Sequence, residues 1–148
     1  RRQRQMCIRD SIYMVVQGFI ECVEGGSLEM EAFLRVPPEG MTQGVQITAA
    51  GEKVRASLLQ WWEAQQNNLP PKVNTYYGER TMLSVLERTA WHAAQHCRQL
   101  QAVVENCGMA PNGALGDAEL GGLPLPENIY DNEIDMNDDN IETKPMLL

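Results

Sequence analysis

One long helical pattern, over residues 79–107, constrains the fold of this chain more than any other feature. Apolar and small side chains recur there at alternating steps of four and three, as on one face of an α-helix. This face consists of Met82, Leu86, Thr89, Ala93, His96, Leu100 and Val103. Gly108 can adopt the left-handed conformation that ends a helix, and Pro111 prevents its continuation. A helix of about eight turns needs other elements to cover its apolar face, which favours a helical fold.

Two further helices are predicted, over residues 7–24 and 43–66. Gly25-Gly26 ends the first, and Thr42 is a candidate N-cap for the second. Gly51 costs the second helix about 1 kcal/mol relative to alanine. No alternating β pattern is found. Shorter turns are expected within residues 27–41, where Ser27 can cap, and over residues 117–120 and 126–130.

Together these elements predict an all-α fold, an antiparallel helical bundle over residues 1–111. Residues 112–148 form an acidic, mostly irregular segment containing Pro and Gly, which we expect to pack on the body or to be partly disordered. A four-helix bundle would need one more helix. Either that helix precedes Arg1 in a longer chain, or a partner chain covers the open face.

A homodimer is the simplest way to cover this face. The strip left open by three helices would carry side chains such as Ile12, Phe19, Leu86 and Val103. The interface would then include part of the 7–24 or the 79–107 helix. The alternative contact is the 43–66 helix with its Trp61-Trp62 pair.

His92 and His96 are the two histidines of the chain, and both lie on the 79–107 helix. Side chains four residues apart lie one above the other on a helix, about 5–6 Å apart at Cβ. Two such imidazoles can share one metal ion, and a metal-free histidine can act as an acid or base. Alternatively, they are buried or cleft-lining side chains hydrogen-bonded to backbone or to Gln95 and Gln99.

Charge and cysteine usage narrow the function classes. Residues 1–116 carry equal numbers of basic and acidic side chains, so residues 117–148 supply the net charge of −8. Nucleic-acid binding is disfavoured because it needs a basic surface. No apolar run is long enough to span a membrane. Cys7, Cys22, Cys97 and Cys107 match no zinc-binding spacing, so we expect reduced thiols in a cytoplasmic protein.

Three stretches resemble the DinB/YfiT-like superfamily. Residues 83–96, following Tyr76-Tyr77-Gly78, resemble its histidine-bearing helix, and Arg9–Met14 resembles its other ligand-bearing helix. The loop of residues 121–127 resembles that of a bacterial branch. The resemblance implies a four-helix bundle, often dimeric, with a divalent metal held by three histidines. It also implies activation of a low-molecular-weight thiol such as bacillithiol or mycothiol, for transfer or isomerisation.

The chain departs from this pattern at the metal site, because Met14 occupies the position of the expected third ligand. In many members the paired histidines correspond to Arg88 and His92, and an arginine stays protonated and cannot bind a metal. We therefore expect no metal, or a weakly bound zinc or nickel ion, at His92 and His96. Two functions remain open: a binding or interaction domain with a degenerate metal site, or a metal-dependent thiol transferase or isomerase. Whether the protein is an enzyme is left open.

Overall fold

The computed structural model describes residues 2–33, 35 and 43–129, with the side chains of residues 2–11 and Phe33 excepted. The described part is mostly helical. Three long helices are present: α1 (Arg2–Gly25), α2 (Gly44–Gln65) and α3 (Met82–Asn106). They confirm the three predicted helices, although α1 begins five residues earlier than expected, and α3 begins three residues later. A short 3₁₀ helix, η1 (Met30–Phe33), follows α1, and α4 (Asp117–Leu120) follows α3.

The ends of α3 follow directly from its sequence. Thr81 is the N-cap, and its hydroxyl accepts a hydrogen bond from the Ser84 backbone N–H at 3.2 Å. At the other end Gly108 has φ of 75°, as predicted. The Gly108 N–H donates to the Glu105 carbonyl and the Met109 N–H to the Val104 carbonyl, which together form a Schellman motif.

The prediction that the chain has no β structure was wrong. A three-stranded sheet of order β1-β2-β3 contains β1 (Ser27–Leu28), β2 (Lys72–Thr75) and β3 (Gly78–Thr81). β1 pairs parallel with β2, and β2 pairs antiparallel with β3. Ser27 therefore begins a strand instead of capping a helical turn. Strands this short and polar show no alternation, because only Val73 is buried in the β2–β3 hairpin.

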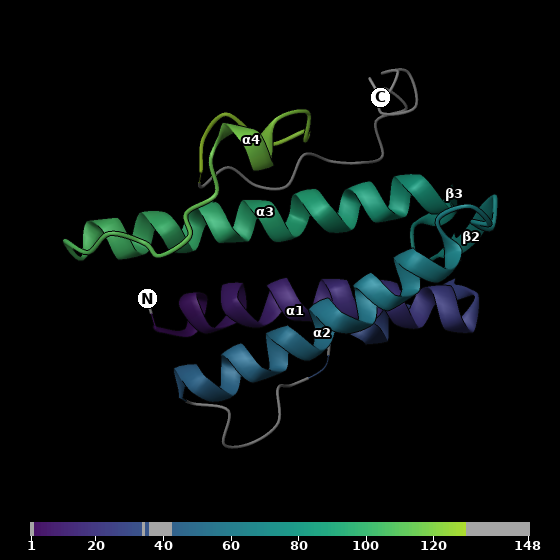
Figure 1. Cartoon of the computed structure of the whole chain (residues 1–148), viewed down its shortest axis with the longest axis horizontal. Helices are drawn as coiled ribbons and strands as arrows, with labels where there is room; N and C mark the ends of the chain where they lie inside the picture. Colours follow the sequence, from purple (N-terminus) through teal and green to yellow (C-terminus); the bar gives the residue numbers. More distant parts are fainter. Residues whose placement is uncertain (1, 34, 36–42, 130–148) are drawn as a thin grey trace.

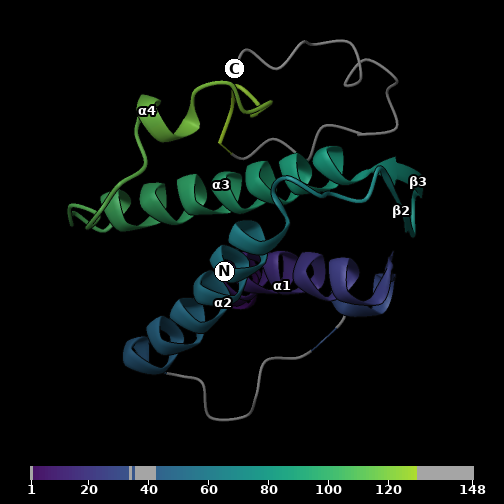
Figure 2. The same cartoon turned by 45° about the vertical axis from the view of Figure 1, so that its right-hand side comes forward.

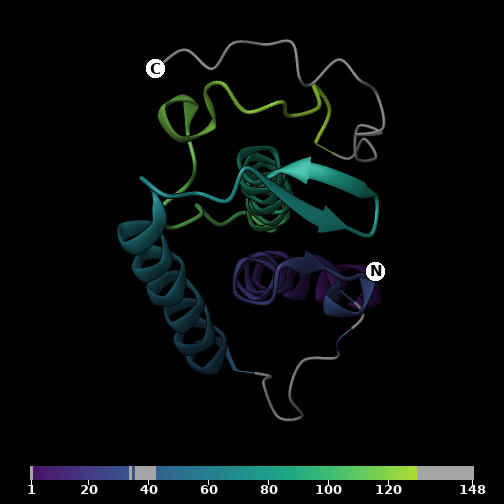
Figure 3. The same cartoon turned by 90° about the vertical axis from the view of Figure 1, so that its right-hand side faces the viewer.

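The long helices form two contacts of different geometry. α1 and α3 lie side by side and antiparallel (Figure 1), while α2 crosses α1 obliquely (Figure 2). Viewed along α3, α1 lies on one side of it, and α4 with residues 121–129 lies on the other (Figure 3). α3 is thus the central element, and it contacts both the body and the C-terminal segment.

The hydrophobic core lies where α1, α2 and α3 meet the sheet. Its buried members are Phe19, Cys22, Leu28, Val73, Met82 and Val85. Phe19 is completely buried, and its ring meets the Trp61 ring edge-on with centroids 4.9 Å apart. The expectation that Phe19 belongs to an exposed strip was therefore wrong, because α2 covers it. Leu86, also expected in that strip, is half-buried and packs against the core.

Several smaller expectations are also decided. The helical turn predicted at residues 117–120 is confirmed as α4, whereas residues 126–129 are not helical. Thr42, the predicted N-cap of α2, lies outside the described residues, and Gln43 takes the N-cap position. The backbone N–H of Gln43 donates a hydrogen bond to Gln46 Oε1 at 3.2 Å. Within the described ranges, no helix has the length and apolar character needed to cross a membrane.

Candidate functional site

The two histidines form a direct ring contact on α3. Their imidazole centroids are 4.6 Å apart, and the planes meet edge-to-face at 84°. Both side chains are half-buried, and the His92 ring also lies 6.0 Å from the ring of the buried Trp91. The expected one-turn spacing therefore brings the two imidazoles together, at the border between the core and the surface.

His96 is held by Gln99, one turn further along α3. The distance between His96 Nδ1 and Gln99 Oε1 is 2.8 Å. Gln99 Nε2 in turn donates to the backbone carbonyl of Ile129 at 3.0 Å. The His96 imidazole is thus hydrogen-bonded through Nδ1 to a glutamine one turn away.

A second glutamine binds the same carbonyl group. Gln95 is buried, and its Nε2 donates to Ile129 O at 2.8 Å. Arg98 donates from one guanidinium nitrogen to Gln95 Oε1 at 2.8 Å and to Pro126 O at 3.0 Å. Residues 123–129, which we call the C-terminal strap, are thus fastened to α3 beside the histidines.

Met14, the expected third ligand, is half-buried on α1. α1 lies antiparallel beside α3, which carries the two histidines. A zinc or nickel site needs three or four donors with good geometry, and the thioether of Met14 is a poor one. Among the described residues, no three His, Cys, Asp or Glu side chains are grouped to hold a metal.

Three cysteines in the described part of the chain are free thiols. Cys22 is buried, Cys97 is half-buried and Cys107 is exposed. Burial raises the pKa of the Cys97 thiol, and burial with the nearby charge of Glu29 raises the pKa of Cys22. Both thiols are therefore kept protonated and unreactive at neutral pH, which argues against a nucleophilic role beside the histidines.

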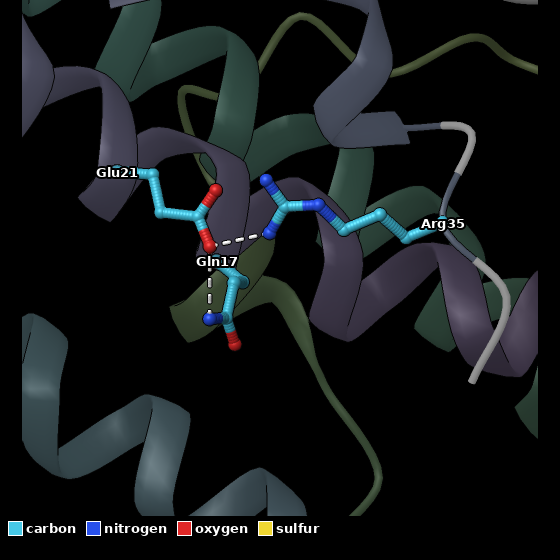
Figure 4. A network of polar contacts seen from close by, with 3 residues as sticks. All are labelled: Gln17, Glu21 and Arg35. Atoms are coloured by element: carbon cyan, nitrogen blue, oxygen red, sulfur yellow. Dashed lines mark hydrogen bonds and ion pairs between the residues drawn. The ribbon is translucent and has the colours of Figure 1, made fainter. Parts of the chain in front are cut away.

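A groove with a volume of about 690 Å³ lies between α1 and α2, away from the histidines. Its lining includes Gln17, Ile20, Glu21, Glu24, Gln60 and Trp61. Glu21 accepts hydrogen bonds from Arg35 and Gln17 (Figure 4). The bond from Arg35 holds the pKa of Glu21 below its ordinary value, despite the opposing effect of burial. The Glu21 carboxylate is thus already paired within the chain.

The surface of α2 is unusually apolar for an exposed helix. None of its 22 residues is buried. Leu58 and Trp61 pack against the core from one side. On the other side Leu59 is 46% exposed and Trp62 is 38% exposed. Sequence reasoning named the Trp61-Trp62 pair as an alternative contact. In the structure Trp61 packs on Phe19, and the partly exposed Trp62 ring lies 6.1 Å from the Trp61 ring, centroid to centroid.

The strap contacts were missed by sequence reasoning. The positions of Gln95 and Gln99 four residues apart show that they share a face of α3. Their common partner, however, is a backbone carbonyl 30 residues or more along the chain, which no side-chain pattern signals. No protein-family model, curated protein or solved structure matches this chain.

Proposed function

We propose that this protein is a DinB-like helix-bundle domain that acts in binding and interaction, with a degenerate metal site at His92 and His96. One observation carries the proposal: α2 is a long helix without a buried residue, and it presents Leu59 and Trp62 to its surroundings. A helix of a folded domain normally buries an apolar stripe. An uncovered apolar stripe is typical of a surface on which another chain docks.

A second copy of the chain is the partner that best suits α2. Leu59 and Trp62 continue a row on the helix that begins with Glu52 and Arg55, an ion pair with N and O 2.9 Å apart. In a two-fold arrangement of two antiparallel α2 helices, this row of one chain packs against the same row of the other chain. With the two-fold axis near Leu59, the apolar ends of the two rows pack against each other, and the Glu52–Arg55 ion pairs lie outside the apolar contact. Fully burying a Leu-sized side chain contributes about 1.5–3 kcal/mol. Because Leu59 is 46% and Trp62 38% exposed, each side chain of the homodimer contributes roughly half of that or less.

Leu59→Glu tests the interface. The substitution places a charge in the apolar part of the row, so the dimer should dissociate at least about tenfold more readily. Leu83→Glu is the matched control, because Leu83 is also 46% exposed but lies on α3. Sedimentation equilibrium of both variants gives the dissociation constants. Equal constants for the two variants would contradict an interface on α2.

The alternative function is a divalent-metal-dependent thiol transferase or isomerase, and the contact between His92 and His96 favours it. Met14→His tests it, because this change supplies a third imidazole at the position that the resemblance gives to the third ligand. We expect weak, partial binding of nickel or zinc by the unchanged protein and at least about tenfold tighter binding by the variant. Calorimetric titration measures both, and Met14→Leu is the control for altered packing. Tight stoichiometric binding by the unchanged protein would favour the enzyme.

The charge and the cysteines of the chain also bear on the location and partners that we propose for this domain. We further propose a cytoplasmic location, because the spacing of the cysteines suits reduced thiols. The net charge of −8 disfavours nucleic acid as a partner.

A further inference from the structure

The hydrogen bonds between the C-terminal strap and α3 have fixed directions. Ile129 O is a carbonyl oxygen, so it can only accept, and the Gln99 group facing it at 3.0 Å must be the NH₂. The same oxygen accepts from Gln95 Nε2, and both of its lone pairs are then used. Arg98 can only donate, which fixes the orientation of the Gln95 amide as well. Neither glutamine can turn over without losing a hydrogen bond beside the buried face of α3.

The orientation of Gln99 decides where the proton of His96 lies. With the Gln99 NH₂ on the strap, its carbonyl oxygen Oε1 faces His96 Nδ1 at 2.8 Å. A carbonyl oxygen donates nothing, so Nδ1 must carry the hydrogen. In the neutral imidazole the lone pair then lies on Nε2.

We propose that the C-terminal strap and Gln99 form a relay that selects this tautomer of His96, so that Nε2 is the proton-accepting atom of the neutral His96 ring. Gln99 is a positioning residue in this relay, since it acts through His96. The partner that suits Nε2 in this tautomer is a hydrogen-bond or proton donor, such as a hydroxyl, ammonium or thiol group. The relay rests on the contacts between α3 and the strap, and not on the α2 interface or on a metal.

The relay also couples the strap to the histidines. Among the described contacts of the Gln99 side chain, the carbonyl of Ile129 is the one that fixes the orientation of the amide. Detaching Ile129 removes this contact. The amide can then turn and offer its NH₂ to Nδ1, which favours the other tautomer, with the hydrogen on Nε2. Loss of the strap should therefore change the chemistry of His96 without changing any residue of the pair.

Nitrogen-15 NMR of the ring nitrogens tests the relay in the full-length chain. The protein has two histidines, and His92→Asn assigns the resonances of His96. At a pH where the ring is neutral, we expect His96 Nδ1 at the shift of a protonated nitrogen and Nε2 at that of an unprotonated one. In Gln99→Leu the difference between the two shifts should collapse or reverse.

Gln101→Leu is the matched control, because Gln101 lies on the same helix and exchanges hydrogen bonds with the backbone of Leu115. It should leave both His96 shifts unchanged. Gln99→Asn, whose shorter side chain cannot reach both partners, replaces Gln99→Leu if that variant does not fold. An Nε2–H tautomer in the unchanged protein would overturn the proposal. So would a Gln99 variant that keeps the native shifts, because Gln99 would then be structural only.

Discussion

At the scale of single residues, Tyr77 shows how the fold tolerates an incomplete polar contact. Its hydroxyl is buried, with no hydrogen-bond partner among the described residues. Arg88 and Arg80 lie over the ring, at 4.8 and 5.6 Å from its centroid, and the Tyr76 ring meets it edge-on. Burial raises the pKa of Tyr77 against the opposing charge of Arg88. The ring, and not the hydroxyl, makes the contacts that stabilise this corner.

Tyr77→Phe should therefore leave the free energy of unfolding unchanged or raise it by up to about 1 kcal/mol, since it removes a buried group that forms no hydrogen bond. Urea unfolding measures the change. Tyr76→Phe, at the exposed neighbour, is the control. A loss of more than about 1 kcal/mol in Tyr77→Phe alone would show that the hydroxyl has a partner.

The candidate site was predictable at this scale only in part. Helical spacing alone predicted that His92 and His96 meet, and it named Gln99 as a neighbour, because contacts one turn apart are local. The fastening of Gln95 and Gln99 to Ile129 depends on the path of a loop after α4, which local spacing does not determine. The tautomer of His96 depends on that fastening, and so it could be derived only from the structure.

At the scale of elements, the contact between α1 and α2 depends on one glycine. From the sequence, Gly51 is only a weak point of a helix. In the structure the Tyr13 ring occupies the space that a side chain at Gly51 would need. A Cβ atom at Gly51 would lie 2.6 Å from Tyr13 Cε1. The glycine thus allows α2 to approach α1 closely enough for Trp61 to cover Phe19. The helices were predictable from periodicity, but their crossing was not, because it depends on this shape match.

Gly51→Ala should destabilise the protein by about 1–3 kcal/mol, although alanine favours the helix itself, because overpacking displaces Tyr13. Gly44→Ala is the control, since nothing lies within 4 Å of a Cβ at Gly44. Thermal unfolding of the two variants compares the effects. Equal or higher stability of Gly51→Ala would contradict the close approach of the helices.

At the scale of the whole molecule, periodicity predicted a mostly helical chain and the order of its long helices. The small sheet was missed because its strands are short and polar and depend on pairing between segments far apart in sequence. The open face was predicted on α1 and α3, yet α2 covers Phe19 and itself presents the apolar surface. We therefore propose the partner surface at Leu59 and Trp62, on the helix that the sequence offered as the alternative contact.

Sedimentation equilibrium of the unchanged protein at micromolar concentration tests the central claim most directly. The account predicts a species of twice the chain mass of 16.6 kDa, with the fluorescence of Trp62 shielded from an aqueous quencher. A 16.6 kDa species over the whole concentration range, with Trp62 open to the quencher, would contradict it.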